Sequence, residues 1–407
     1  YALEEAWTDA GLCTRVFASG LRQPRGAVVT PMGDVLVVER QDGVHEVTLL
    51  YSTDADVVAD GKLTVAQAPG LNHGIALRDG YLYASSDSTV YRWSFVEANV
   101  TREQPRKVTT GPREVVVFNV NEDGQGGAPQ GHRTRTLEIG PNNWLYVSVG
   151  SLGNVDPSPY RSRIRRFNLS MIPPDGFDFQ YGEVFADGVR NEVGLALDSA
   201  GVLWGVDNGP DYARRSDLAG EDMYHDNPGE ELNRFPEAQA GGFYGYPYCW
   251  TEGDLPNTGL GRGTQWAWES FMPPQDNYTD AWCRANAIPP RQTFQAHSAP
   301  LGIVFYKGRT SQWNDSYCHV NGSPVGLDPT WEGHAFVAFH GSWNRNPPTG
   351  YKVVRVPFAN PGNSTPSADY TDLLRHDGTE ARWGSGFRPV DVVMDHCGRL
   401  FVTDDAT

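Results

Sequence analysis

One short string recurs along the chain and limits the folds that the chain can adopt. Each copy opens on a turn residue, continues with Leu or Phe beside aromatic or β-branched residues, and ends on small or polar residues; an apolar segment usually precedes it. Such strings, bounded by turn signals, are typical of two antiparallel strands joined by a short turn. The six copies begin at Gly33, Gly80, Asn143, Gly201, Gly333 and Gly398.

Two strands repeated six times predict the inner halves of six propeller blades. We therefore expect an all-β protein, a six-bladed β-propeller that forms one domain over residues 1–407. The longest interval between copies runs from Gly201 to Gly333 and contains loop-like segments such as Asp226–Gly229, so it predicts a long insertion between blades four and five. A count of seven blades stays open, and no long amphipathic helix is expected.

Composition and charge exclude several classes of partner. Aromatic residues are 12% of the chain and hydrophobic residues 39%, enough to fill a sizeable core. The formal net charge of −17 argues against binding to nucleic acid or to anionic membrane surfaces. No apolar run approaches the roughly 20 residues that a membrane-spanning helix needs. Because no signal peptide is present, we expect the sequence to be a mature or excised fragment.

Glycosylation signals and cysteines favour an extracellular protein. The five cysteines are an odd number, so at least one thiol is unpaired within the chain. Cys249 with Cys283 is the preferred disulfide, Cys13 with Cys397 would join the two ends of the chain, and a fully reduced set stays open. Secretion is expected from the Asn-x-Ser/Thr sequons. These begin at Asn99, Asn168, Asn277, Asn314, Asn321 and Asn363.

Polar residues stand in register with the repeat. In a two-stranded hairpin the start of one strand lies beside the end of the next, so polar groups at both places share one end of the propeller, near its central channel. Loops on a rigid scaffold commonly carry binding and catalysis. The groups before the first strands are Arg25, His73, His132, Arg190 with Asn191, His297 and Arg388. The groups after the second strands include Arg40, Ser151, Asn208–Pro210, His340 and Asp404–Asp405.

The basic residues of this set indicate the ligand. An acidic chain has placed Arg40, Arg190 and Arg388 around one opening. Because guanidinium groups bind carboxylates with two parallel hydrogen bonds, the cluster favours a polyanionic small ligand. The alternative is that each arginine pairs with a local aspartate or glutamate.

Several further motifs run from about Arg25 to Asp404. They are His132, Leu137–Pro141, Leu145–Ser151, Arg190–Asn191, Asp207–Pro210, Glu231–Asn233, Gly242–Pro247, His297–Gly302, Phe339–Arg345 and Phe387–Val390. With these motifs the chain resembles the quinoprotein glucose and sorbosone dehydrogenases, and among them most of all the fungal pyranose dehydrogenases. The resemblance implies pyrroloquinoline quinone (PQQ) and calcium as cofactors and oxidation of a sugar. It also implies a cytochrome as electron acceptor, which can be a haem domain of the same polypeptide.

The resemblance also implies individual roles. His132 is expected to remove the hydroxyl proton while hydride passes to the quinone, a task for which imidazole is suited. The carbonyls of Gly209 and Pro210 are expected to bind calcium, a hard ion that takes oxygen ligands. His73 and His297 are weaker candidates at the rim. The expected cofactor-binding residues, some of them added from register or local motif, are Arg40, Arg190, Asn191, His340, Trp343 and Arg388.

Two departures from the bacterial glucose enzymes bear on the expectation. Ser151 stands where those enzymes support the base with an aspartate, and Gly386 stands where they have a second arginine. The side contacts of the cofactor should therefore differ, and a preference for glucose does not carry over. Two other functions stay open: a calcium-dependent propeller hydrolase of the lactonase kind, and a propeller that binds partners without catalysis. The register positions offer mainly Arg and His, which disfavours a hydrolase that holds calcium by acidic side chains.

Overall fold

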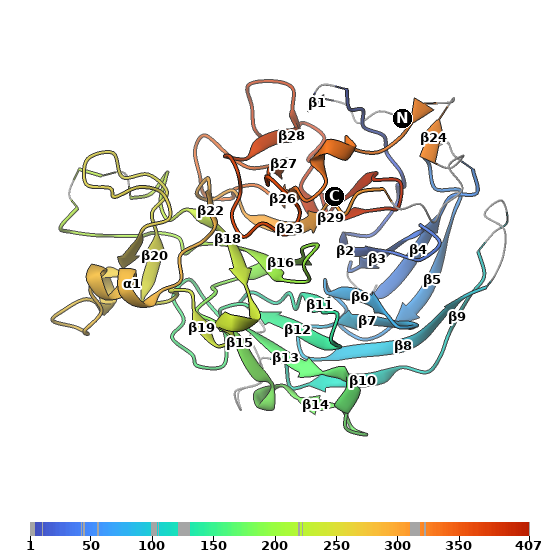
Figure 1. Cartoon of the computed structure of the whole chain (residues 1–407), viewed down its shortest axis with the longest axis horizontal. Helices are drawn as coiled ribbons and strands as arrows, with labels where there is room; N and C mark the ends of the chain where they lie inside the picture. Colours follow the sequence, from blue (N-terminus) through green and yellow to red (C-terminus); the bar gives the residue numbers. More distant parts are fainter. Residues whose placement is uncertain are drawn as a thin grey trace.

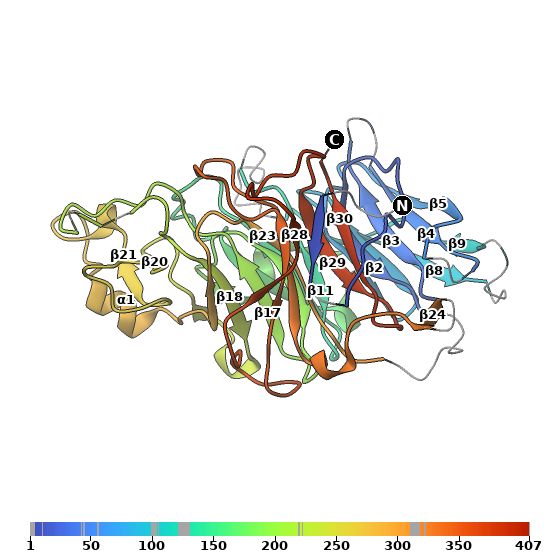
Figure 2. The same ribbon diagram turned by 90° about the horizontal axis from the view of Figure 1, so that it is seen from above.

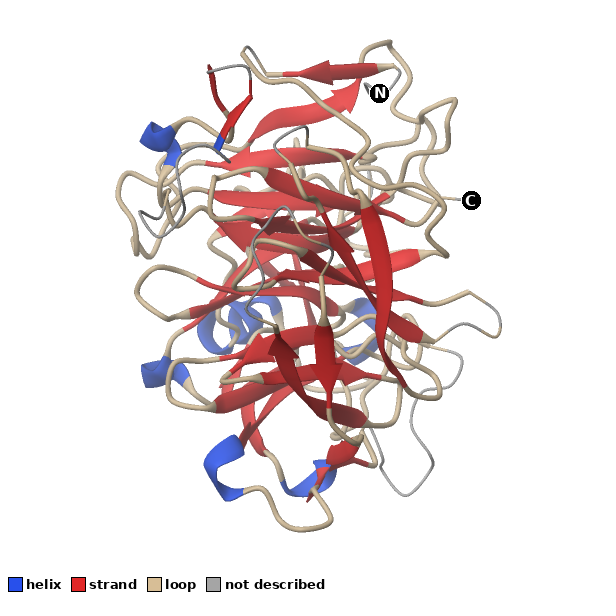
Figure 3. Cartoon of the chain, turned by 90° about the vertical axis from the view of Figure 1, so that its right-hand side faces the viewer, coloured by secondary structure: helices blue, strands red, loops and turns tan. Residues whose placement is uncertain are grey.

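The computed structural model describes residues 5–406 apart from 10, 42, 44, 55–56, 99–103, 105, 121–130, 219, 222, 310–317 and 321–322. Strands dominate the described residues, and Figure 3 shows that helices are few and short. The longest of them is the α-helix α1, Asp280–Asn286. None of the described helices has the length and apolar character needed to cross a bilayer. The expected all-β propeller is confirmed, and its sheets are arranged around a centre in Figure 1.

Within the residues that the structure describes, five sheets have four or more strands and form five blades. Blade one consists of β2 (Pro24–Val29), β3 (Val35–Glu39), β4 (Glu46–Tyr51) and β5 (Gly61–Gln67). Blade two consists of β6 (Ile75–Arg78), β7 (Tyr81–Ser85), β8 (Val90–Glu97) and β10 (Glu114–Phe118), with β9 (Val108–Thr110) and β14 (Phe177–Asp178) at its outer side. Blade three consists of β11 (Leu137–Ile139), β12 (Trp144–Val149), β13 (Arg163–Asn168), β15 (Glu183–Asp187) and β19 (Gly242–Phe243).

The last two of these blades complete the set. Blade four consists of β16 (Glu192–Leu197), β17 (Leu203–Asp207), β18 (Glu230–Phe235) and β22 (Gln292–Phe294). Blade five consists of β23 (Pro300–Phe305), β26 (Ala335–Phe339), β27 (Lys352–Val356) and β28 (Thr371–His376), and β1 (Ala6–Thr8) pairs with the outer side of β28. The short strands β24 (His319–Val320) and β25 (Ser323–Pro324) pair with each other.

The prediction of six blades is wrong for the described structure. The sixth repeat forms only a two-stranded sheet, in which β29 (Pro389–Met394) pairs with β30 (Leu400–Asp404). This sheet lies between blade five and blade one, because β29 contacts both β23 and β2. Within the described residues no third strand covers β30, so β30 is half-buried along its length whereas the corresponding strand β26 is buried throughout.

The expected insertion between blades four and five is also wrong. Blade four ends with β22 at Phe294, and blade five begins nearby at Pro300. The long elaboration instead lies within blade four, because β18 and β22 pair directly and residues 236–291 connect them. This segment carries β20 (Cys249–Thr251), β21 (Gln265–Ala267) and α1, which extend to one side of the ring in Figures 1 and 2.

A side-chain hydroxyl in the repeat connects neighbouring repeats. Ser85 Oγ donates to the carbonyl of Arg135 at 2.6 Å, and Ser148 Oγ donates to the carbonyl of Glu192 at 2.5 Å. Thr403 Oγ1 occupies the same place in the last repeat and donates to the carbonyl of Arg25 at 2.8 Å. In these three repeats the hydroxyl residue at the end of the string thus joins a second strand to the start of the next repeat, and Thr403 closes the ring between its last and first members.

The cysteines pair in a partly unexpected way. The disulfide between Cys249 and Cys283 is confirmed. The suggestion that Cys13 joins Cys397 is wrong, since Cys397 is bonded to Cys318 and Cys13 is free and exposed. The fold brings Cys318 and Cys397 together across a sequence separation of 79 residues, which no pattern in the sequence indicates.

Candidate functional site

Strand pairing brings the predicted polar residues to one end of the propeller. In blade four Glu192 at the start of β16 pairs with Asp207 at the end of β17. The same relation holds for Pro300 with Phe339 in blade five and for Pro389 with Asp404 in the last sheet. Residues just before the first strands and just after the second strands therefore lie side by side, as the register argument predicts.

His132 is held by Ser151 in one orientation and one tautomer. Its Nδ1 lies 3.0 Å from the Ser151 carbonyl and 2.9 Å from Ser151 Oγ. The hydroxyl proton of Ser151 goes to the carbonyl of Gly153 at 2.6 Å, so both groups that face Nδ1 act as acceptors. Nδ1 therefore carries the proton, and Nε2 carries the free lone pair.

The surroundings of His132 keep it neutral. Burial and the nearby charge of Arg190 lower the pKa of the imidazole to about 3. Ser151 supplies acceptors without a negative charge, so it orients the ring and does little to favour the imidazolium form. At neutral pH this histidine can accept a proton at Nε2.

Gly150 allows His132 and Asn191 to approach each other. A Cβ atom at residue 150 would lie 2.6 Å from the Cβ of His132 and 2.6 Å from Oδ1 of Asn191. Real Cβ contacts do not come this close, so either side chain would have to move. The glycine belongs to the signature string of the third repeat, but its role there was not predicted.

Arg190 is bound mainly by neutral oxygen atoms. Its Nη1 donates to the carbonyls of Asn208 at 3.1 Å and Gly209 at 2.9 Å. Its Nε and Nη2 donate to the carbonyl and the side-chain oxygen of Asn154, at 3.2 and 3.0 Å. The nearest carboxylate oxygen, on Asp211, is 3.8 Å from Nη2. Arg190 is thus positioned chiefly by neutral oxygen atoms, with a long ion pair to Asp211.

Asp207 fixes the backbone that carries Arg190 and Asn191. Its two carboxylate oxygens accept the amide protons of Arg190 at 2.7 Å and Asn191 at 2.5 Å. Burial and the charge of Glu231 raise the pKa of Asp207 well above its ordinary value. These two hydrogen bonds hold the backbone of Arg190 and Asn191 in place just before β16.

A second group of basic residues surrounds Asp405. Arg25 Nη1 is 2.6 Å from one oxygen of Asp405, and His340 Nε2 is 2.8 Å from the other. Burial opposes ionisation of Asp405, but the hydrogen bond from His340 and the charge of Arg25 outweigh it, so the pKa of this carboxyl lies well below its ordinary value. Arg388 joins the group by donating to the carbonyls of His340 and Gly341, at 3.2 Å each.

Positive charge exceeds negative charge in this group. Among the described residues neither Arg40 nor Arg388 forms an ion pair. Burial and the charge of Arg25 lower the pKa of Arg40 to about 10. Burial and the same arginines lower the pKa of His73 well below its ordinary value, and its buried Nδ1 has no hydrogen-bond partner. The alternative in which every arginine is paired locally does not describe Arg40 and Arg388.

The residues expected to bind calcium form a turn at the end of β17. The amide of Gly209 donates to Glu230 Oε2 at 2.7 Å, and its carbonyl accepts from Arg190. Pro210 is buried beside it. The described residues contain no group of three His, Cys, Asp or Glu side chains that could hold a metal ion. A metal at this turn would therefore draw largely on carbonyl oxygens, and the carbonyl of Gly209, which accepts from Arg190, keeps a second lone pair for an ion.

Trp343 lies at the edge of the site. Its side chain is 66% exposed, and its ring meets the ring of Tyr212 edge-on with centroids 6.4 Å apart. The tryptophan is therefore no part of the core, which was the alternative interpretation of its sequence. His297 lies nearby, with Nδ1 3.2 Å from Asp211 Oδ1.

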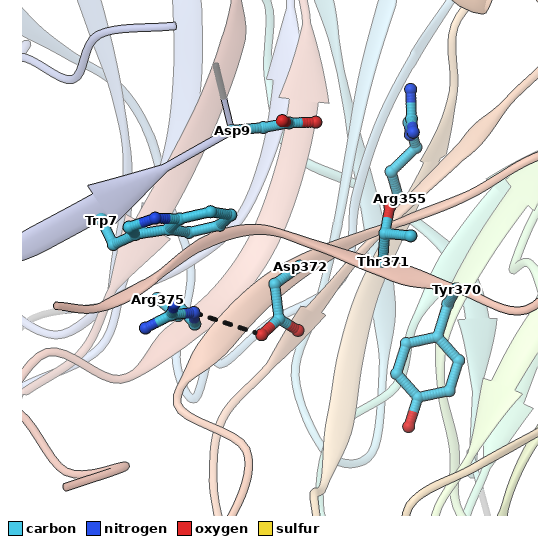
Figure 4. Close-up of a pocket in the computed structure, with 7 residues that line it drawn as sticks. All are labelled: Trp7, Asp9, Arg355, Tyr370, Thr371, Asp372 and Arg375. Atoms are coloured by element: carbon cyan, nitrogen blue, oxygen red, sulfur yellow. Dashed lines mark ion pairs between the residues drawn. The ribbon is translucent and has the colours of Figure 1, made fainter. Parts of the chain in front are cut away.

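An open pocket of about 600 Å³ lies away from this end, at the outer side of blade five. Figure 4 shows Arg375 below the ring of Trp7, with its guanidinium carbon 4.3 Å from the ring centroid. None of the predicted site residues lines it. The lining residues are Trp7, Asp9, Arg355, Tyr370, Thr371, Asp372 and Arg375.

Sequence reasoning missed three residues that organise the site. Asn154 and Asp211 bind each other through backbone and side chain, at 2.6 and 2.7 Å, and both approach Arg190. Asp211 directly follows the Gly209-Pro210 turn, which was a usable signal, whereas nothing marks Asn154. Glu230 directly precedes the motif Glu231–Asn233 and lies outside it.

These features define a β-propeller whose repeats converge on a cationic opening with a neutral, oriented histidine. Comparisons with known proteins agree with this description. The TrAA12-like family model matches residues 6–407, and the chain belongs to this family. It is 32% identical over 423 residues to a pyrroloquinoline quinone-dependent pyranose dehydrogenase of Coprinopsis cinerea, covering 95% of this chain and 52% of that protein. The chain thus spans about half the length of that curated relative.

Two solved structures extend the comparison. The holo form of the pyranose dehydrogenase PQQ domain from Coprinopsis cinerea matches with a TM-score of 0.78 and 30% identity, over 98% of this chain and 94% of that one. The calcium structure of the Trichoderma reesei family AA12 enzyme matches with a TM-score of 0.77 and 30% identity, over 100% of this chain and 94% of that one. The resemblance to the PQQ domains of fungal pyranose dehydrogenases is confirmed.

Proposed function

We propose that this chain binds PQQ at the end of the propeller where His132, Arg190 and Arg388 lie, and that it oxidises a sugar at a hydroxyl or hemiacetal carbon. The observation that carries the proposal is the tautomer of His132, whose Nδ1 proton is used by Ser151 so that Nε2 is free to accept a proton. Because burial and Arg190 keep the ring neutral, Nε2 is unprotonated over the physiological pH range.

The charges of the site suit a cofactor with several carboxylates. Arg40 and Arg388 have no acidic partner among the described residues, and Arg25 Nε is buried without a hydrogen bond. A bound anion would neutralise this excess of positive charge and so reduce the repulsion between the basic side chains. The anion would be held by electrostatic attraction and by hydrogen bonds from the guanidinium groups. We assign Arg40, Arg190, Asn191, His340 and Arg388 to the binding of PQQ.

When bound, PQQ would supply the hydride acceptor, which no side chain can provide. This chain's own residues would hold the cofactor, orient the sugar hydroxyl and receive its proton at Nε2 of His132. Trp343, exposed at the edge, would contact the sugar or the cofactor through its ring. The proposed substrate class is a pyranose or 2-keto-aldose.

We also propose calcium at the carbonyls of Gly209 and Pro210. The proposal is supported by the fixed turn, in which Glu230 holds the Gly209 amide, and by the similarity to the calcium structure of the Trichoderma reesei enzyme. Calcium takes oxygen ligands, including carbonyls, and would polarise a quinone oxygen as a Lewis acid. A cytochrome is proposed as the electron acceptor, either separate or as a haem domain of a longer polypeptide.

One experiment separates the proposal from its alternatives. Apo protein is mixed with PQQ and calcium chloride, and cofactor absorbance and sugar-dependent reduction of a redox dye are followed. His132→Ala should retain the cofactor and lose most turnover, whereas His334→Gln, at the opposite end of β26, should behave as wild type. Hydrolysis of a lactone in calcium alone would favour the hydrolase, and absence of PQQ binding would reject the proposal.

Secretion is part of the proposal. It is supported by two disulfides and by Asn277, a sequon residue that is exposed. Asn168 and Asn363 are half-buried, and the sequons at Asn99, Asn314 and Asn321 begin outside the described residues. Expression in a eukaryotic secretory host should give a protein in the medium whose mass falls on enzymatic deglycosylation; an unmodified, intracellular product would contradict it.

A further inference from the structure

Three loops meet around the imidazole of His297 at the edge of the site. His297 precedes β23, Asp211 and Tyr224 lie between β17 and β18, and Asn344 follows β26. His297 Nδ1 is 3.2 Å from Asp211 Oδ1, and His297 Nε2 is 2.5 Å from the carbonyl of Tyr224. The single imidazole thus connects two points of the loop 208–229.

The third loop is attached to the same atoms. Asn344 Nδ2 donates to Asp211 Oδ1 at 2.8 Å, the oxygen that also faces His297. The hydroxyl of Tyr224 donates to the carbonyl of Asn344 at 2.5 Å. Arg345 Nη2 is 2.8 Å from Asp226 Oδ1, so the next residue along the chain repeats the connection. His225 Nε2 also lies 3.0 Å from the carbonyl of Asn346, so four separate polar contacts fasten loop 341–350 to loop 208–229.

His297 has the protonation state and burial that such a connection needs. Both ring nitrogens face acceptors, a carboxylate and a carbonyl, and each contact requires a proton on the ring. Burial acts against the charged ring, but the hydrogen bond with Asp211 and the charge of Glu230 outweigh it and raise the pKa of His297. The side chain is only 4% exposed, and the residue has a φ of 62°, uncommon outside glycine.

Each of the two fastened loops carries an exposed aromatic ring. Tyr212 follows Asp211 and is 48% exposed, and Trp343 precedes Asn344 and is 66% exposed. The rings of Tyr212 and Trp343 meet edge-on, and the ring centroids of Tyr212 and Tyr224 are 5.9 Å apart. Large exposed aromatic residues beside a polar site are typical of binding surfaces for ligands with both apolar and hydroxyl faces, as sugars have.

We propose that His297 and Asp211 are positioning residues of the sugar site, which hold Tyr212 and Trp343 together as one aromatic edge against which a pyranose ring packs. Neither touches the reacting atoms; they act by fixing the loops that carry the two rings. This inference rests on the proposed function for its ligand, and the contacts that carry it do not depend on that function.

The test compares His297→Gln and Tyr224→Phe with the control His334→Gln. Gln at 297 cannot reach both acceptors with the geometry of imidazole, and Phe at 224 keeps the ring contacts while it removes the hydroxyl bond to Asn344. Hydrogen–deuterium exchange is measured on peptides from 208–229 and 341–350. Exchange in both peptides should rise about tenfold or more in the two variants and stay unchanged in the control.

Kinetics form the second arm, with PQQ affinity measured by absorbance titration. KM for the sugar should rise about tenfold, while kcat falls less than about threefold and PQQ affinity is unchanged. Unchanged exchange in both variants would overturn the connection of the loops, and raised exchange with an unchanged KM would overturn its role in sugar binding. If wild-type protein with PQQ oxidises no sugar, the proposed function fails, and the exchange arm still decides whether His297 fastens the loops.

Discussion

The Oγ of Ser151 lies 2.9 Å from Nδ1 of His132 and gives its own proton to the carbonyl of Gly153. The imidazole is therefore oriented by a neutral hydroxyl and not by a carboxylate. Without a negative charge at Nδ1, burial and Arg190 lower its pKa to about 3. The acid limb of activity should accordingly lie far below neutrality.

Ser151→Asp should move that limb upward. A carboxylate beside Nδ1 favours the imidazolium form, so the pKa of His132 rises and the free base is lost at a higher pH as acid is added. The dependence of kcat/KM on pH, measured with PQQ saturating, should show an acid limb shifted up by about one unit or more. Ser151→Ala, which adds no charge, should not shift it upward; equal profiles for wild type and Ser151→Asp would contradict the assignment of His132.

Arg388→Lys should weaken PQQ binding by about tenfold or more, because an ammonium group cannot reproduce the two-pronged contact of a guanidinium with a carboxylate. Absorbance titration of apo protein with PQQ measures the effect. Arg78→Lys is the matched control, since Arg78 lies at the end of β6 outside the site and its side chain is 36% exposed. Equal affinities for the two variants would remove Arg388 from the cofactor site.

Gly150→Ala should destabilise the protein by about 1–3 kcal/mol and reduce turnover, because the added Cβ would lie 2.6 Å from atoms of His132 and Asn191. Urea unfolding gives the free energy, and dye reduction gives the rate. Gly153→Ala provides the control in the same loop, where a Cβ meets nothing within 4 Å. A Gly150→Ala variant as stable and active as Gly153→Ala would show that the contact relaxes without consequence.

Thr403→Val should lower the free energy of unfolding by about 1–3 kcal/mol, since the hydroxyl both donates to the Arg25 carbonyl and accepts from the Asp391 amide. Valine keeps the shape and removes both bonds. Thr371→Val, at an exposed position on β28, should have no effect beyond about 0.5 kcal/mol. If the two variants unfold alike in urea, the closing bond contributes little to the ring.

The sequence predicts what depends on local periodicity. The recurring string correctly gives the paired inner strands and places His132, Arg190 and Arg388 at one end, because the pleat and the hairpin fix where each strand begins and ends. It does not give the number of complete blades, because outer strands such as β9, β14 and β19 lack the string. The sequence predicts the elaboration between blades four and five because β22, the strand that follows it and completes blade four, is only three residues long and lacks the repeated string.

Contacts between distant loops were beyond prediction. Asn154 and Asp211 bind each other across 57 residues, and Cys318 meets Cys397 only because the last sheet lies beside blade five. Such pairs depend on how whole blades pack. Asp211 could have been found, because it adjoins a turn already singled out; Asn154 carries no sign of its position.

The lobe that extends from blade four, residues 236–291, also contacts residues that support the site. Tyr246, within residues 236–291, accepts the amide proton of Asp156 at 2.7 Å and donates to the carbonyl of Asn154 at 3.1 Å, the residue on which Arg190 rests. The ends of the lobe join neighbouring strands, so relatives could vary its length away from its contacts with blade four, but the stretch around Tyr246 must keep its place beside Asn154. A change in the outer lobe can therefore reach the opening through the hydroxyl of Tyr246.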